Sequence, residues 1–266
     1  MPNNASTEHK PTERVLDILE LLASNPAGLT LTEISTQIKA SKSTILPIMH
    51  TLAKRRFAAF DDRSYRYTIG LGCYCIGSAY TSSFNALDFI RQQMRAVVKE
   101  TAEICQLGLL DKNQVLYVAK EEAPDDKVRI VSYVGKRLPA YTSAIGKALL
   151  SNKSRTELQE LYPDELEAYT AKTITSLDVL KEELLKVQKL GYSEEFGEYS
   201  EDTRCIAVPL RRNGEVILAI SVSVPAYRMT DEKKENIIRA LLEAQQVIEI
   251  YLKNKNISAD QLVIYH

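Results

Sequence analysis

The chain has 266 residues, of which 45% are hydrophobic and 26% charged, and its formal net charge is −1. The length suggests about two domains, and the composition is that of a globular protein, which excludes intrinsic disorder and collagen-like repeats. Its apolar runs are far shorter than the ~18 residues needed to cross a bilayer. The N-terminus is polar and lacks the apolar core of a signal peptide, so we expect a cytoplasmic protein.

The rarer residue types argue against metal sites and against nucleophilic catalysis. The four cysteines form no C-x-x-C pair, and the three histidines stand far apart at His9, His50 and His266. A structural zinc site or a Ser-His-Asp relay therefore has few ligands or bases to draw on. The glycine-rich motifs of dinucleotide and P-loop sites are absent from the sequence. We expect no enzyme, no metal and no cofactor.

The first seventy residues predict three helices followed by a hairpin. Apolar residues between Val15 and Leu22 recur at i, i+3, i+4 and i+7, which is typical of one face of a helix. A capping box at residues 30–33 predicts a second helix, and Ser41 can cap a third with a core face from Ile45 to Leu52. Residues 57–60 and 65–69 then predict two strands around a polar turn at residues 61–64.

This order of elements is typical of a winged helix-turn-helix domain, in which the third helix enters the major groove of DNA. Up to residue 68 the segment carries nine basic and seven acidic side chains, and several of the basic ones follow the third helix. The candidate DNA contacts are the polar start of that helix and the arginines after it: Lys42, Ser43, Thr44, Arg55, Arg56, Arg63 and Arg66. The alternative is a three-helix protein-interaction module with a charged edge.

This half of the chain resembles the isocitrate lyase regulator (IclR) family of bacterial transcription factors. The resemblance is carried by ERVLDILELLA, LTEISTQIKASKSTI and the run DDRSYRYTIGLG. The chain departs from the family at Leu46-Pro47, where relatives usually have a polar or basic pair. Because proline inside a helix removes a hydrogen bond, we expect base contacts to rest on the start of the helix rather than on its middle.

The remaining sequence predicts a linker helix and an α+β domain with an antiparallel-rich sheet. Apolar stripes at residues 69–80 and 87–104 favour core packing or a subunit interface, and the resemblance implies a homodimer or homotetramer. We expect a flexible tail at 1–11, the winged helix-turn-helix at 12–69, the linker helix at 70–84, the second domain at 85–253 and a polar tail at 254–266. The pattern predicts strands around Lys112-Asn113 and at Lys127–Val134, helices at Tyr141–Leu150, Ser154–Tyr162, Leu177–Leu190 and Asp231–Lys253, and a hairpin on Asn213-Gly214.

The second domain is similar to the effector-binding region of the same family, which implies a GAF-like fold. The similarity is carried by GKRLPAYTSAIGKALLS, LGYSEEFGEYSEDTRCIAVPL and GEVILAISVSVPAYRMTDE. It implies a small-molecule pocket formed by Ser143, Ala144, Glu195, Cys205, Ser221 and Ser223.

The residues of this pocket also suit a small anion on physical grounds. Ser221 and Ser223 share one face of a strand about 7 Å apart. Ser143 and Ala144 lie where a helix begins, so their N–H groups suit an anion. Glu195 stands where relatives often carry Asp, which would shorten the cavity.

Together these observations predict a ligand-responsive, DNA-binding transcriptional regulator, a repressor of a metabolic operon. Its partners would be double-stranded operator DNA, a small carboxylate effector and further copies of itself, with no membrane partner. One alternative is a hydrolase that uses Ser143 or Cys205 as nucleophile, although no histidine lies between His50 and His266 to serve as its base. The other is an interaction protein that does not bind DNA.

Overall fold

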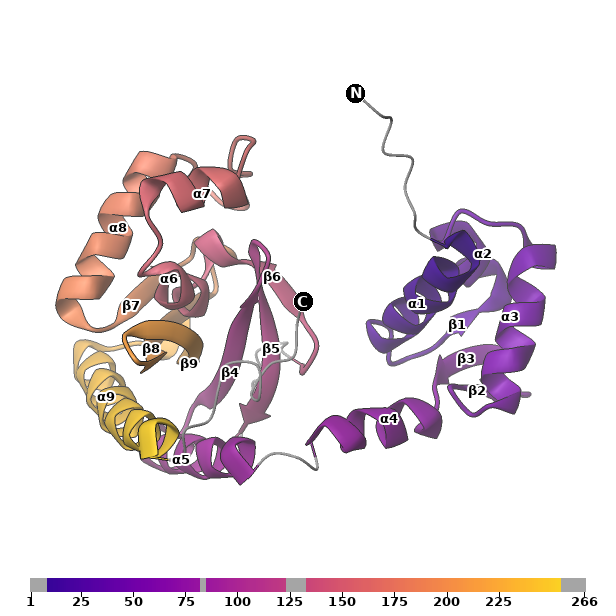
Figure 1. Cartoon of the computed structure of the whole chain (residues 1–266), viewed down its shortest axis with the longest axis horizontal. Helices are drawn as coiled ribbons and strands as arrows, with labels where there is room; N and C mark the ends of the chain where they lie inside the picture. Colours follow the sequence, from indigo (N-terminus) through magenta and orange to yellow (C-terminus); the bar gives the residue numbers. More distant parts are fainter. Residues whose placement is uncertain (1–8, 82–84, 123–132, 255–266) are drawn as a thin grey trace. The chain divides into compact units, whose positions relative to one another are not determined.

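The computed structural model describes residues 9–81, 85–122 and 133–254 (Figure 1). These residues form an α+β protein with two compact units, residues 1–83 and 84–266. No helix in the described ranges is long and apolar enough to cross a membrane.

The first unit contains three helices, a small antiparallel sheet and a fourth helix. Its elements are α1 (Lys10–Ala23), β1 (Leu29–Thr30), α2 (Leu31–Gln37), α3 (Lys42–Lys54), β2 (Ala58–Asp61), β3 (Arg66–Ile69) and α4 (Leu71–Thr81). The strand order is β1-β3-β2, and both pairings are antiparallel. Helix α1 begins two residues inside the segment predicted as a tail, since Pro11 suits the first turn of a helix.

The predicted caps of the first unit are present in the structure. Thr30 and Glu33 form the full capping box of α2, and the Ser41 hydroxyl accepts a hydrogen bond from the Thr44 backbone N–H. The predicted apolar faces meet in one core in which Ile18, Ile34 and Ile45 are fully buried. Helix α3 continues through Pro47, so the proline does not end the helix that carries the candidate base contacts.

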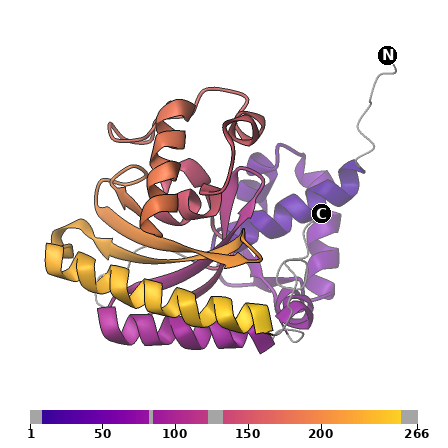
Figure 2. The ribbon, with the colours of Figure 1, turned by 60° about the vertical axis from the view of Figure 1, so that its left-hand side comes forward.

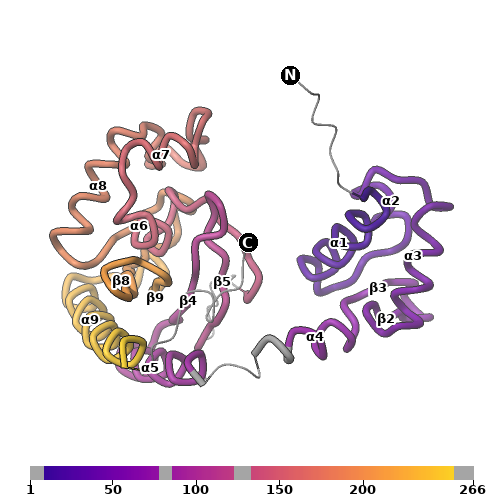
Figure 3. Tube along the Cα trace, viewed as in Figure 1, coloured from indigo at the N-terminus to yellow at the C-terminus, as the bar shows by residue number. Residues whose placement is uncertain are grey.

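The second unit is built on a six-stranded antiparallel sheet of order β6-β5-β4-β9-β8-β7. The trace in Figure 3 labels β4, β5, β8 and β9 of this sheet. Its elements are α5 (Asn85–Thr101), β4 (Ile104–Asp111), β5 (Gln114–Glu121), β6 (Arg137–Pro139), the 3₁₀ turn η1 (Ala140–Thr142), α6 (Ala144–Leu150), α7 (Arg155–Leu161), α8 (Leu177–Leu190), β7 (Ser193–Phe196), β8 (Thr203–Arg212), β9 (Glu215–Pro225), η2 (Ala226–Arg228) and α9 (Asp231–Asn254).

Helices cover both faces of this sheet. Helices α5 and α9 lie side by side on one face, and α6 packs on the other with α7 and α8 beyond it (Figures 1 and 2). Each face has its own apolar core, because side chains along a strand alternate between the two faces of the sheet. The predicted β8–β9 hairpin turns on Asn213 and Gly214, both with positive φ, as a two-residue type I′ turn requires.

The structure differs from one prediction for the second unit, and another falls mostly outside the described residues. The helix predicted over Tyr141–Leu150 is wrong at its start, because Ser143 has an extended backbone that separates the short turn η1 from α6. Gly146 allows the close packing of these two elements, since a Cβ there would lie 1.9 Å from the Ala140 carbonyl oxygen. The strand predicted at Lys127–Val134 falls mostly outside the described residues, and the described strand that pairs with β5 on that side is β6.

Candidate DNA-binding surface and candidate effector site

The start of α3 presents three exposed polar side chains, Lys42, Ser43 and Thr44. The Ser41 hydroxyl lies 2.9 Å from the hydroxyls of both Ser43 and Thr44, so the cap of the helix also orients these two side chains. Hydroxyl and ammonium groups at the N-terminus of a recognition helix can contact base edges or phosphates. The structure therefore brings the three predicted residues together on one helix end.

The middle of α3 presents two apolar residues and one histidine to the solvent. Leu46 is 38% exposed, and Pro47 and His50 are exposed as well. The sequence analysis expected no base contacts from this stretch and did not select His50. Helical spacing could have indicated His50 as a candidate DNA contact, because positions 43, 47 and 50 fall on the same side of an α-helix.

The end of α3 is joined closely to the beginning of α4. Arg56 has a positive φ of 62°, and its carbonyl oxygen accepts a hydrogen bond of 2.7 Å from the Gly72 backbone N–H. Gly70 donates to the Phe57 carbonyl at 2.9 Å, and a Cβ on Gly70 would lie 2.2 Å from the Arg56 oxygen. The side chains of Arg55 and Arg56 are exposed at this junction, where they suit phosphate groups.

The two arginines of the β2–β3 hairpin, the wing, have different surroundings. Arg63 is exposed in a turn where the Asp61 carboxylate accepts hydrogen bonds from the Arg63 N–H and the Ser64 hydroxyl. Arg66 points back into the domain and donates to the Gly28 carbonyl at 2.7 Å and to the Glu33 carboxylate at 3.2 Å. The Thr30 backbone N–H and hydroxyl, together with Arg66, lower the pKa of Glu33. Arg66, which was predicted to contact phosphate, therefore already bonds two groups of its own domain.

In the second unit, neighbouring strands bring four predicted effector residues together. Glu195 on β7 pairs in register with Cys205 on β8, and Cys205 pairs in register with Ser223 on β9. The Cys205 thiol lies 3.2 Å from the Ser223 hydroxyl. Ser221 and Ser223 point to the same side, as the alternation of the strand predicts, because both donate to one acceptor, the Gln106 side-chain oxygen, at 3.4 and 2.9 Å.

Gln106 on β4 is a site residue that the sequence reasoning missed. It is 2% exposed and pairs in register with Ser221 on the neighbouring strand. Gln106 could have been noticed as the one amide among the apolar residues at the start of β4. A buried polar side chain needs a hydrogen-bond partner, so such a residue marks a polar cluster.

Glu195 is buried in strand β7. It is 2% exposed, and its carboxylate accepts hydrogen bonds from the backbone N–H groups of Glu198 at 2.5 Å and Tyr199 at 3.4 Å. These bonds hold the start of the β7–β8 connection against the carboxylate. Glu195 therefore has one oxygen engaged by its own chain.

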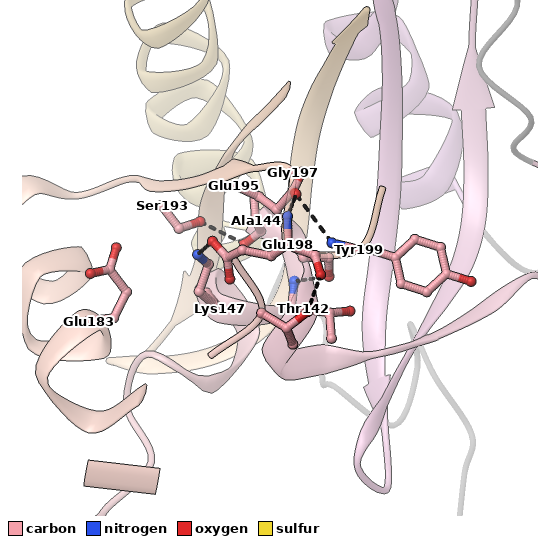
Figure 4. Close-up of polar contacts among 12 residues, drawn as sticks. Thr142, Ala144, Lys147, Glu183, Ser193, Glu195, Gly197, Glu198 and Tyr199 are labelled. Atoms are coloured by element: carbon pink, nitrogen blue, oxygen red, sulfur yellow. Dashed lines mark hydrogen bonds and ion pairs between the residues drawn. The ribbon is translucent and has the colours of Figure 1, made fainter. Parts of the chain in front are cut away.

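A buried ion pair lies beside Glu195. The Lys147 ammonium on α6 is 2.6 Å from the Glu198 carboxylate, and Lys147 is only 1% exposed (Figure 4). Sequence reasoning missed both residues. The available signal is a single charged side chain in the short apolar helix AIGKALL, since a lysine is rarely buried without a partner.

The two predicted residues at the start of α6 have structural partners. The Ser143 hydroxyl caps the helix by accepting a hydrogen bond of 3.2 Å from the Gly146 N–H. The Ala144 carbonyl accepts a hydrogen bond of 2.7 Å from the Ser193 hydroxyl on β7 (Figure 4). The bond between Ser193 and Ala144 fixes α6, and with it Lys147, against the strand that carries Glu195.

The two candidate nucleophiles of the hydrolase alternative, Cys205 and Ser143, are in surroundings that do not activate them. Burial, followed by the nearby Glu195 charge, raises the pKa of the Cys205 thiol, so the thiol stays protonated and is a poor nucleophile. The Ser143 hydroxyl serves as a helix cap, and no histidine lies in this half of the chain before His266. Among the described residues no group of histidine, cysteine, aspartate or glutamate side chains is arranged to hold a metal ion.

Comparisons with known proteins cover both units. Residues 11–62 match the IclR helix-turn-helix domain, and residues 78–250 match the C-terminal domain of the bacterial transcriptional regulator IclR. The HTH-type transcriptional regulator KdgR of Escherichia coli is 31% identical over 252 residues, which cover 92% of this chain and 95% of KdgR.

Solved structures agree with these matches. A crystal structure of an IclR transcriptional regulator from Alicyclobacillus acidocaldarius has a TM-score of 0.82 at 25% identity and covers 92% of this chain and 99% of that one. An IclR homologue from Microbacterium hydrocarbonoxydans, complexed with 4-hydroxybenzoate, has a TM-score of 0.78 at 23% identity and covers 91% and 98%. The chain belongs to the IclR family of bacterial transcriptional regulators and binds DNA through its helix-turn-helix domain.

Proposed function

We propose that this regulator acts in the cytoplasm as a repressor of a metabolic operon and that a small carboxylate effector controls its affinity for operator DNA. The observation that carries the proposal is that the two units carry different kinds of polar groups. The first presents an exposed polar helix start and exposed arginines, and the second encloses a cluster of buried polar side chains around Glu195. A protein bound at an operator excludes other proteins from it, so repression is the simplest outcome.

In the proposed DNA complex, α3 enters the major groove with its N-terminal end toward the bases. Lys42, Ser43 and Thr44 contact base edges, while Arg55, Arg56 and Arg63 neutralise phosphates. Arg66 contributes to DNA binding indirectly: its side chain holds β3 against the start of α2 and so keeps the wing in position.

The proposed effector site contains all six residues that the family resemblance implies, together with Gln106. Hydroxyl and amide groups there, which bond one another through Gln106, are of the types that suit an oxygen-rich ligand. The 4-hydroxybenzoate in the structure of the Microbacterium homologue carries a carboxylate and a hydroxyl, which supports this ligand class. The proposed residues are Ser143, Ala144, Glu195, Cys205, Ser221 and Ser223.

We also propose that the protein acts as a homodimer or homotetramer. Helix α4 exposes Leu71, Tyr74 and Ile76 at 62%, 71% and 62%, a high exposure for large apolar side chains on one short helix. A subunit interface would cover these groups and would place two winged helices on a two-fold symmetric operator.

Effector control of DNA affinity is a matter of thermodynamic linkage. The ligand changes DNA affinity only by as much as it distinguishes the DNA-bound arrangement from the free one, and DNA then changes ligand affinity by the same factor. The proposal therefore predicts that the two measured changes, in DNA affinity and in ligand affinity, are equal.

The test is fluorescence anisotropy with DNA from upstream of the protein's own gene, repeated with a panel of two- to six-carbon organic acids. We expect salt-sensitive DNA binding that at least one acid weakens. Ser221→Ala and Ser223→Ala should weaken binding of that acid by about 1–3 kcal/mol while the ligand-free DNA affinity stays nearly unchanged. DNA binding that is absent, or that no acid weakens, would contradict the proposal, and so would an acid response that both serine variants leave unchanged.

A further inference from the structure

Buried charge in the second unit is concentrated at one place. In the described part of the chain the buried charged side chains are Glu103, Lys147, Glu195 and Glu198, so Lys147 is the one buried cation there. Glu103 has its own partners, Arg228 and Lys233. The other three form a cluster with one positive and two ionisable acidic groups. Among the buried side chains of the described residues, a carboxylate ligand entering this region can find a full positive charge only at Lys147.

Lys147 is part of the same neighbourhood as the proposed effector residues. Helix α6 packs against β7, β8 and β9, and its first residue is bonded to Ser193 on β7. The positive charge of Lys147 also opposes the rise in the pKa of Cys205, which places the ammonium within electrostatic reach of that thiol. Figure 4 shows Lys147 and Glu198 pointing toward one another beside Glu195, while Glu183 on α8 lies apart from the pair.

Glu198 is an imperfect partner for this lysine. One of its carboxylate oxygens bonds Lys147, but the other is buried and has no hydrogen-bond partner among the described residues. Burial raises the pKa of Glu198, and the Lys147 charge opposes that rise. A buried carboxylate with an unsatisfied oxygen is costly, so the pair is weaker than a fully bonded one. A carboxylate that also bonds neighbouring hydroxyls would be a better partner for Lys147.

The backbone around Glu198 is fixed, so only its side chain needs to move. The Thr170 hydroxyl donates to the Gly197 carbonyl and the Thr173 hydroxyl to the Glu198 carbonyl, both at 2.6 Å. The Glu198 N–H is held by Glu195. Rotation about the side-chain bonds of Glu198 can therefore free the ammonium without unfolding the β7–β8 connection.

We propose that Lys147 is a carboxylate-binding subsite of the effector site and that the Glu198 side chain occupies it until the carboxylate of the effector takes its place. The proposal rests on the proposed effector-binding function and adds the group that recognises the effector's charge. Glu195 and the serines then contact the hydroxyl or carbonyl groups of the ligand. Because the cluster already contains two acidic groups, a third carboxylate fits only when Glu198 leaves Lys147.

The experiment is chemical rescue of Glu198→Ala, with formate and acetate as the probes. This variant removes the internal carboxylate and leaves the buried ammonium unpaired, so its melting temperature should fall below that of the unaltered protein. Formate or acetate should raise the melting temperature of the variant by about 3 °C or more in a saturable way, relative to chloride at equal ionic strength. The unaltered protein, with Glu198 in place, should respond less.

Two controls define the result. Acetamide, which has the shape of acetate without its charge, should not rescue Glu198→Ala, and Lys147→Met/Glu198→Ala should show no preference for formate over chloride. Should Glu198→Ala fail to fold, Glu198→Gln replaces it, and we expect acetate to stabilise that variant more than the unaltered protein because an amide competes more weakly for the ammonium. Equal responses to carboxylate and chloride, or rescue that persists without Lys147, would overturn the proposal.

The melting experiment contains no DNA, so it separates the two proposals. Carboxylate rescue at Lys147 combined with DNA binding that ignores every organic acid would support the subsite and contradict effector control. An acid that weakens DNA binding, combined with no rescue, would support effector control and overturn the role given to Lys147.

Discussion

The Arg66 guanidinium lies 3.2 Å from the Glu33 carboxylate, and this contact joins strand β3 of the wing to the N-terminus of α2. The same carboxylate caps α2 through Thr30, so a single acidic group links a helix cap to the wing. Arg66 and Arg63 are only three residues apart, yet the structure gives them different tasks. Arg63 is exposed at the turn, whereas Arg66 holds the turn's supporting strand in place.

The first prediction separates these two arginines. Arg63→Ala should weaken binding to all DNA sequences alike and lower the slope of log affinity against log salt by about 1, because one phosphate contact is lost. Arg66→Ala should instead lower the melting temperature of the protein as well as its DNA affinity. Anisotropy titrations at several salt concentrations and thermal melts measure both. An Arg63→Ala variant with an unchanged salt slope would remove the wing from the DNA interface.

The second prediction concerns base readout by α3. Thr44→Ala should change the preferred base at one operator position by about 1–3 kcal/mol, since a hydroxyl on the helix start can bond a base edge. Leu46→Ala should weaken binding only to sites with thymine opposite the exposed side chain, where an apolar group meets the thymine methyl. Selection from a randomised DNA library, followed by replacement of that thymine with uracil, measures both effects. Unchanged preferences would place the base contacts elsewhere.

The third prediction concerns self-association through α4. The full chain should sediment as a species larger than the 29.9 kDa monomer at micromolar concentration. Tyr74→Glu/Ile76→Glu should shift the protein toward monomer because charge is unfavourable in an apolar interface. Ile250→Glu on α9 is the matched control, since Ile250 is 61% exposed and Ile76 is 62% exposed. Equal sedimentation of both variants and the unaltered chain would exclude α4 as the interface.

The fourth prediction concerns the cap of α7. The Ser154 backbone N–H, together with Lys153 and the Ser154 hydroxyl, lowers the pKa of Glu157 to about 2. Because the folded pKa is below the unfolded value of about 4.5, the carboxylate stabilises the fold above that value, and the contribution is lost as the pH falls toward 2. Glu157→Gln should therefore flatten the pH dependence of stability between pH 5 and about 3, measured by urea unfolding. An unchanged pH dependence in this variant would show that the cap is not formed in solution.

Much of the fold follows from local patterns in the sequence. The capping residues at Thr30 and Ser41, the apolar faces of α1 and α3, and the Asn213-Gly214 turn are all local signals, and the structure contains each of them. The placement of Ser143 and Ala144 at a helix start is confirmed, since Ser143 is the N-cap of α6, but the separate turn η1 before it was missed. This turn packs closely on α6 because Gly146 has no Cβ to meet the Ala140 carbonyl, a contact that helical periodicity does not reveal.

The site was less predictable than the fold. Ser221 and Ser223 could be placed on one face because strand alternation is a local rule, but their common acceptor, Gln106, is 115 residues distant from Ser221 in sequence. Lys147 and Glu198 were missed for the same reason, since helical spacing gives no sign that a lysine meets a carboxylate from another element. A burial pattern read from one element shows that a charged residue needs a partner and does not identify it.

The hydrogen bond from the Gly72 N–H to the Arg56 carbonyl couples the beginning of α4 to the segment that follows α3. The first turn of α4 packs against the backbone of Arg56, two residues beyond the end of α3, and bulkier residues at Gly70 or Gly72 would force the two segments apart. Helix α4 has 11 residues and is therefore roughly 16 Å long, so a tilt of its far end is delivered to α3 as a rotation. A tilt of α4 would therefore change the direction of α3 without changing the internal structure of α3.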